Sequence, residues 1–231
     1  MAKRKFAPGK VFYICNKSIE GKDIFPCEND RWRLLQAFYF FNNENRFFNL
    51  FYELEKRKDF LPLDILKEHS KAEDNKCEPL VFIMAYCLKD DGFYLLLEEK
   101  EEGGISKFMQ RVNTGYTKYF NNKYKREGHL FRGKFKDKEV IDEDELKHSL
   151  IYINVIEPGR NVKTGAEKKT NNPEELLEFA VNYFWSTHQV YINKREAVIA
   201  DKGKIGTIFP SPKEYLSFAG NVIYGREGLY S

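Results

Sequence analysis

The chain has 231 residues, and its 38 Lys and Arg against 35 Asp and Glu give a formal net charge of +3. Aromatic residues make up 16% of the chain beside 32% charged residues, which is enough apolar mass for a core and excludes a disordered chain. The longest apolar run, 80–88, is far shorter than the roughly 18 residues of a membrane span, and no apolar segment follows the basic residues 3–5. We therefore expect a cytoplasmic protein without membrane contact.

The first half of the chain predicts one helix and three strands. A strand is expected over 11–17, where apolar and polar residues alternate, and a helix is expected from Asp30, where apolar residues recur at helical spacing. Residues 56–75 are charged and irregular and are interpreted as a variable excursion. Strands over 81–88 and 93–98 follow, joined by an Asp-Gly turn that is typical of a tight hairpin.

The second half predicts a helix over 105–124, a strand over 132–141 and a helix that begins at Asp142 and ends at Pro158-Gly159. Together with the first half, this order indicates an α+β fold close to the ferredoxin-like split βαβ motif. We expect a central antiparallel sheet with helices mainly on one face, in a domain over 8–160.

Beyond this domain, residues 161–231 predict a C-terminal helical or irregular extension packed on it. A helix is expected over 173–184, and residues 211–215 resemble the start of another, but the stretch after 203 is rich in turns. No C-x-x-C pair occurs among the four cysteines, so a zinc ribbon has no support and buried reduced thiols are the simpler interpretation.

The charge is unevenly distributed along the chain. Between residues 107 and 138 ten basic residues face only Glu127 and Asp137, a net charge of +8, so the remainder of the chain is net −5. Aromatic residues such as Phe108, Tyr116 and Phe131 are interleaved with these charges. Such a mixture suits a surface that neutralises phosphates and stacks on bases, and it equally suits a solvated helix face beside an ordinary core stripe.

Three runs in this segment, 104–110, 116–121 and 128–136, the last reading GHLFRGKFK, resemble the single-tyrosine HUH transposases. The likeness is to the insertion-sequence-200-like and REP-associated tyrosine transposase branch. Residues 11–16 and 84–88 are similar to two of its strands, and Trp185-Ser186 to its downstream Trp-Ser. The resemblance, over roughly residues 8–190, implies a compact nuclease that binds hairpin or single-stranded DNA, usually as a homodimer.

In that family a helix-borne tyrosine attacks a phosphodiester, and a divalent metal such as Mg²⁺ or Mn²⁺ is held by two histidines and an amide side chain. Carried over to this chain, the tyrosine is Tyr152, and the three ligand positions are Gly92, Tyr94 and Ile156. None of the three can supply the family's ligand, because both histidines and the amide are missing. The resemblance therefore implies a DNA-binding protein with impaired metal-dependent cleavage and no expected cofactor.

Other interpretations of this site remain open. Asp90, Asp91 and Tyr94 offer oxygen ligands for an unconventional magnesium site, although two aspartates before a glycine are also what a hairpin turn needs. His148 lies four residues before Tyr152, so it shares a helix face with the tyrosine and can contact its hydroxyl, or it can be a structural residue. Tyr152 itself can be a buried tyrosine with its hydroxyl at the rim.

We interpret the chain as a DNA-binding relative of these transposases, with three functional alternatives: impaired cleavage, an active metal-dependent enzyme with unconventional ligands, or a module for RNA or a protein partner. The predicted catalytic residue is Tyr152, and no metal ligand is assigned. The predicted DNA-binding residues are the basic ones that the likeness and the charge place together: Lys107, Arg111, Lys118, Lys123, Arg126, Arg132, Lys134 and Lys136.

Overall fold

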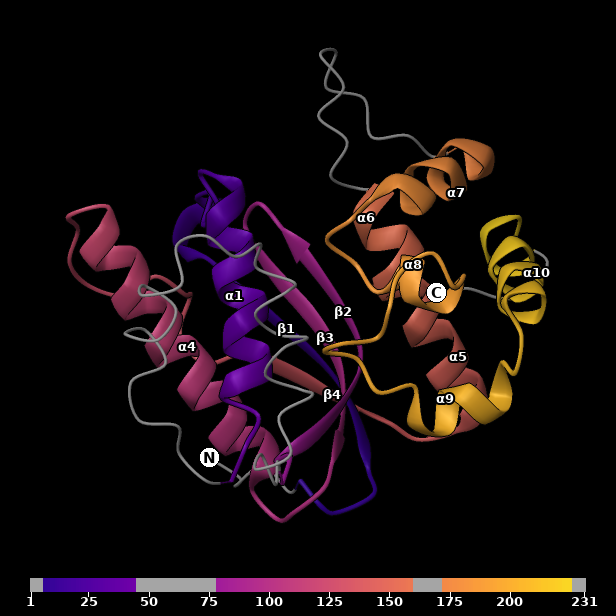
Figure 1. Ribbon diagram of the computed structural model, residues 1–231, viewed down its shortest axis with the longest axis horizontal. Coiled ribbons are helices and arrows are strands. Elements are labelled where there is room, and N and C mark those ends of the chain that lie inside the picture. The colour runs from indigo at the N-terminus through magenta and orange to yellow at the C-terminus, as the bar shows by residue number, and fades with distance from the viewer. Residues whose placement is uncertain (1–5, 45–77, 160–171, 226–231) are drawn as a thin grey trace.

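The computed structural model describes residues 6–44, 78–159 and 172–225. A four-stranded antiparallel sheet in the order β2-β3-β1-β4 lies between two layers of helices (Figure 1). This is the strand order of a ferredoxin-like split βαβ motif, so the predicted α+β fold class is confirmed. The predicted excursion over 56–75 lies outside the described residues.

The four strands are β1 (Val11–Lys17), β2 (Val81–Lys89), β3 (Gly92–Glu99) and β4 (Lys136–Val140). Asp90 and Asp91 form the turn between β2 and β3, which confirms the predicted hairpin. The prediction that β4 begins at 132 is wrong. Phe131 pairs with Ser18 just beyond β1, and Gly133 then takes a φ of +72°, which turns the chain before the ladder with β1 resumes.

Two helices cover the first face of the sheet, α1 (Glu28–Phe40) and α4 (Gly104–Lys123). Phe12 and Ile14 of β1 point to this face, and they pack with Phe38 of α1 in one large hydrophobic cluster. The apolar stripe of α4 joins the same cluster. The 3.6-residue period of the helices and the two-residue period of the strands are therefore both satisfied by one core.

The second face is also covered, a feature that the predicted placement of helices mainly on one face did not describe (Figure 1). Val11, Tyr13 and Cys15 of β1 point to it. The chain segments on this side are α5 (Glu143–Ile151), the π-helix η2 (Tyr152–Ile156), α6 (Glu157–Gly159), α7 (Pro173–Asn182), α8 (His188–Tyr191), α9 (Gly203–Ile208) and α10 (Pro212–Ile223). A short 3₁₀ turn, η1 (Ile19–Gly21), follows β1.

The predicted helix starts follow their local signals. Asp142 caps α5 by accepting a hydrogen bond from the Glu145 amide at 2.7 Å. Ser211 and Glu214 form a capping box at the start of α10, as the run 211–215 predicted. The prediction of a turn-rich stretch after residue 203 missed α9 and the length of α10, whose buried side chain Tyr215 joins the second core.

The edge of β2 is protected by the chain that follows α7. Leu88 N donates to Trp185 O at 2.9 Å, and Thr187 N donates to Tyr86 O at 3.0 Å. Such cover satisfies edge groups that would otherwise be open to another strand. The predicted division at residue 160 stays a prediction; Leu150 and Tyr215, on either side of it, belong to one hydrophobic cluster. In the described part of the chain, no helix is long and apolar enough to cross a membrane.

Candidate nucleic-acid interface

Tyr152 opens the π-helix η2, which widens an otherwise continuous helical path from α5 to α6. Its half-buried ring lies 6.0 Å from the Tyr13 ring, and Tyr13 lies 6.1 Å from Tyr94. We call Tyr13, Tyr94 and Tyr152 the tyrosine cluster. π-Helical turns are frequent at functional sites. No feature of the sequence predicted this one, because its backbone differs from an α-helix only in the hydrogen-bond spacing.

The residues at the metal-ligand positions that the resemblance implies do not fit a divalent metal. Gly92 lies so close to β1 that a Cβ atom would stand 2.2 Å from Asn16 O, and Ile156 is apolar and 8% exposed. Tyr94 is buried, and burial, reinforced by Glu157, raises the pKa of its phenol, which keeps it protonated. Among the described residues, no group of three His, Cys, Asp or Glu side chains could hold a metal ion.

The two aspartates of the hairpin turn have partners of their own. Asp90 accepts a hydrogen bond from Arg31 at 2.6 Å, and Asp91 lies 3.7 Å from Lys17. The Asp90 and Asp91 carbonyls also accept backbone hydrogen bonds from Ile24 and Ser18. These contacts fit the interpretation of Asp90 and Asp91 as turn residues, and they give no support to an unconventional metal site.

Lysines surround the tyrosine cluster. Directly paired residues of an antiparallel ladder point to the same face, and Lys136 pairs with Cys15 while Lys138 pairs with Tyr13. Lys17 lies 5.8 Å from the Tyr94 ring centre. Lysines from two strands therefore line the tyrosine cluster on the second face of the sheet.

A buried ion pair lies next to the tyrosine cluster. Lys89 of β2 donates to Glu157 of α6 at 2.7 Å, with both side chains less than a tenth exposed. The same ammonium group lies 5.7 Å from the Tyr94 ring centre. The sequence analysis did not identify Tyr13, Lys17, Lys89 and Glu157. The two-residue period of a strand places Tyr13 and Lys17 on one face of β1, but no sequence pattern indicated that Tyr152 would pack against that face.

The ten basic residues of 107–138 divide into two groups. Five are engaged by protein groups. Lys107 pairs with Glu44, Arg111 donates to Asn43 O, Lys123 pairs with Asp30, Arg126 donates to Asn121 and His129 O, and Lys138 pairs with Glu145. The other five are Lys118, Lys125, Arg132, Lys134 and Lys136, which are exposed and make no side-chain ion pair or hydrogen bond with any described residue.

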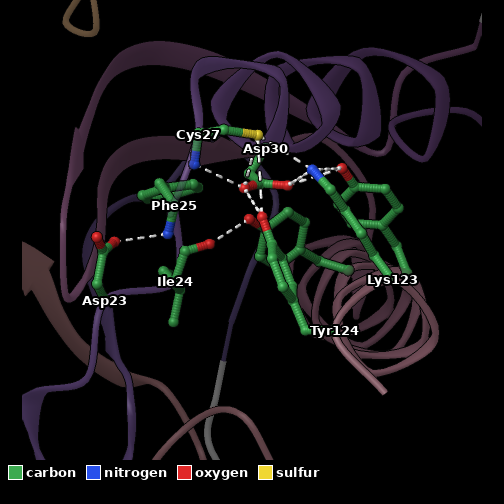
Figure 2. A network of polar contacts seen from close by, with 9 residues as sticks. Asp23, Ile24, Phe25, Cys27, Asp30, Lys123 and Tyr124 are labelled. Carbon is green, nitrogen blue, oxygen red and sulfur yellow. Dashed lines mark hydrogen bonds and ion pairs between the residues drawn. The ribbon is translucent and has the colours of Figure 1, made fainter. Parts of the chain in front are cut away.

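Figure 2 shows why Lys123 belongs to the first group. The carboxylate of Asp30 is fully buried and accepts hydrogen bonds from Lys123 at 2.6 Å, from Tyr119 and Tyr124 at 2.7 Å each, and from Cys27 N at 3.0 Å. Burial alone would raise the Asp30 pKa, but these donors together outweigh it, so the pKa lies below its usual value. Lys123 therefore ties α4 to the start of α1.

The chain between α4 and β4, residues 124–135, is called the connector. It is fixed to the end of β1: Ile19 N donates to Leu130 O at 3.0 Å, and Arg132 N donates to Lys17 O at 2.8 Å. Leu130 and Phe131 are buried beside these bonds. The cations of the connector are therefore displayed on an ordered loop. We call Lys125, Arg132, Lys134 and Lys136 the connector surface, the last being the first residue of β4.

The aromatic residues interleaved with the basic ones do not share this exposure. Phe108, Tyr116, Phe120 and Phe131 are at most 6% exposed and belong to the first core. The interpretation that this set stacks on bases is therefore wrong for these four, and the alternative of a core stripe holds. Their helical spacing on α4 faces the sheet, because that is where apolar area can be buried.

The two histidines near the site lie on separate surfaces. His129 is exposed on the connector. His148 of α5 has its Nδ1 2.7 Å from Asp144 O, and its ring packs edge-on against Phe218 of α10. These contacts give His148 a structural role at the junction of α5 with α10.

A solved structure is similar to this chain, at low sequence identity. No family model and no curated protein matches the chain. Among solved structures it is similar to one described as "Structure of the REP associates tyrosine transposase bound to a REP hairpin", with 10% sequence identity over 89% of this chain and 92% of that chain and a TM-score of 0.45. Likeness at this level shows nothing about the function of this chain.

Proposed function

We propose that the protein binds single-stranded or hairpin DNA through the connector surface, without metal-dependent strand cleavage. The observation that carries the proposal is the set of four exposed cations on the ordered connector and the first residue of β4, none of which has an ionic partner among the described residues. Cations without internal partners are available to displace counterions from phosphates, whereas paired ones must first give up their protein partner. The resemblance of 104–136 to the DNA-handling block of a transposase supports the same partner.

The tyrosine cluster extends this surface onto the sheet. Lys136 pairs with Cys15 across the ladder, and Tyr13 is two residues away along β1. Burial, and after it the neighbouring Cys15, raises the pKa of Tyr13, so its phenol is protonated at neutral pH. A protonated phenol beside a lysine is a donor that suits a phosphate oxygen. We therefore place one phosphate of the bound strand at the Lys136 end of the cluster.

The proposal is tested by replacing Arg132, Lys134 and Lys136 together with Ala and measuring affinity for a labelled DNA hairpin against salt concentration. Each lost phosphate contact on a single strand removes about 0.7 from the log–log slope, so the triple variant should lose about 2 from it. The matched control removes three lysines from the C-terminal part that make no ion pair with a described residue, Lys194, Lys202 and Lys213. Equal slopes for the two variants would mean that net charge, and not the connector surface, governs binding.

The second candidate is an active enzyme that uses Tyr152, and the observation favouring it is the π-helix that begins at this residue beside lysines. It predicts a covalent tyrosyl–DNA adduct that survives denaturation and disappears in Tyr152→Phe. Labelled oligonucleotides incubated with Mg²⁺ or Mn²⁺ provide the measurement. If no adduct forms with Mg²⁺ and none forms with Mn²⁺, this candidate is excluded, and the DNA-binding proposal is unaffected.

Cations on a loop suit RNA as well as DNA, so matched RNA and DNA hairpins should be compared in competition. We expect the DNA hairpin to compete better; tighter binding of the RNA would replace DNA by RNA as the partner. The homodimer that the resemblance implies stays a prediction, which sedimentation with and without the hairpin would test.

A further inference from the structure

Three aromatic side chains outside the proposed site contact one another between α1 and the chain segment that follows α7 along the edge of β2. Trp32 of α1 lies 5.2 Å from Phe184 and 5.1 Å from Trp185, and Phe184 lies 5.2 Å from Trp185, each pair edge to face. All three side chains are partly exposed. We call them the aromatic trio. Trp32 and Trp185 rest on the first core, whereas Phe184 belongs to no core cluster of the described residues.

Cations flank these rings. The Arg31 guanidinium lies 5.6 Å from the Trp185 ring centre, and that of Arg195 lies 4.7 Å from the Phe184 ring centre. Arg195 is held in place by hydrogen bonds to the Phe184 and Ser186 carbonyls. Flat rings provide a stacking surface, and Arg195, which makes no ion pair with a described residue, adds a cation beside it, the combination that binds unpaired bases.

Direct contacts connect the aromatic trio to the connector surface. Arg31 bonds to Asp90 of the hairpin turn, and the adjacent Asp91 lies 3.7 Å from Lys17. The backbone of Lys17 in turn accepts the hydrogen bond from Arg132. All these groups lie at one end of the sheet, where β1 and β2 end and β3 and β4 begin. Asp90 and Asp91 each lie beside a cation, so neither places an unpaired negative charge between the aromatic trio and the connector surface.

We propose that the aromatic trio stacks on unpaired bases of a DNA strand whose phosphates lie along the connector surface. The inference rests on the proposed function and narrows it to single-stranded DNA, including the unpaired part of a hairpin. A duplex keeps its bases stacked inside and offers these rings no open base face, whereas every base of a single strand presents one. The aromatic trio therefore provides discrimination between strand forms, and the connector surface provides charge.

The two tryptophans of the chain are both in the aromatic trio, so tryptophan emission reports on this site alone. Oligothymidine should quench the emission of the unmodified protein on binding, and a blunt duplex at equal phosphate concentration should not. Anisotropy of the labelled DNA measures binding in the same samples. Saturable anisotropy with unchanged emission would overturn the inference while leaving the proposed function intact, whereas no anisotropy change with any DNA would overturn both.

A variant gives a second measurement. Phe184→Ala should weaken oligothymidine binding by about tenfold, because it removes the stacking ring that belongs to neither core, and should leave duplex binding unchanged. Phe218→Ala, which removes a half-buried ring on α10, is the matched control and should bind both DNAs as the unmodified protein does. Equal loss of single-strand affinity in the two variants would overturn the assignment of Phe184.

Discussion

Helix α4 and the connector that follows it share one basic segment of the sequence, yet the side chains of all α4 cations except Lys118 bind protein groups, whereas those of all connector cations except Arg126 have no partner among the described residues. Lys107, Arg111 and Lys123 of α4 are held by groups of the protein itself, whereas Arg132 and Lys134 of the connector have no side-chain partner among the described residues. The net charge of a segment is therefore not the charge it offers to a ligand. Partners from distant parts of the chain decide which cations are available.

The largest expected effect concerns the partner of Lys123. Asp30→Asn should lower the free energy of unfolding by about 3 kcal/mol, because a neutral amide replaces the buried carboxylate that accepts hydrogen bonds from Lys123, Tyr119 and Tyr124. Urea unfolding measures it. Glu44→Gln, which removes the exposed partner of Lys107, is the control and should leave the midpoint unchanged. Similar midpoints for the two variants would contradict the structural role of Lys123.

The Asp30 interaction also has a definite pH dependence. The folded-state pKa of Asp30 is lowered, so its contribution to stability is fully present above the ordinary aspartate pKa and is lost as pH falls through the folded value. The unmodified protein should therefore lose more stability on acidification than Asp30→Asn does. Parallel acid curves for the two proteins would show that other carboxylates govern the acid transition.

A smaller effect is expected in the connector. Gly133 has a φ of +72°, and no atom lies within 4 Å of the point that an alanine Cβ would occupy. Gly133→Ala therefore strains the backbone without a clash and should cost about 1 kcal/mol in the free energy of unfolding. If the connector displays its cations as an ordered loop, DNA affinity should fall as well. Gly9→Ala, at another exposed glycine of positive φ, is the control and should change stability but not DNA binding.

The smallest effect is expected for the paired cations of α4. Lys107→Ala should leave DNA affinity and its salt slope unchanged, because Glu44 already neutralises that ammonium group. Lys134→Ala, with the same change of charge on the connector, should reduce the slope by about 0.7. Titrations of both variants against one hairpin decide this. Equal reductions would erase the distinction between α4 and the connector.

Local patterns were sufficient for most of the fold. The alternation in 11–17, the Asp-Gly turn after β2 and the acidic start of α5 each indicated their element, because each depends on residues close in sequence. The second layer of helices and the π-helix at Tyr152 were not predictable in this way. Covering the second face depends on packing of η2, α6 and α9 against β2 and β3, which lie far away in the chain, and a local sequence pattern does not indicate such contacts.

The amino-acid sequence alone was sufficient for the α+β order and for the concentration of positive charge in 107–138. It also showed that Gly92, Tyr94 and Ile156, the positions where the resemblance places metal ligands, carry no histidine or amide side chain. Which cations are available to a ligand depends on the three-dimensional fold, because an ion pair such as Lys123 with Asp30 joins residues far apart in the chain. The fold also brought Tyr13 to Tyr152 and Trp32 to Trp185. Electrostatic pairing and stacking depend on distance in space, which a linear pattern does not contain.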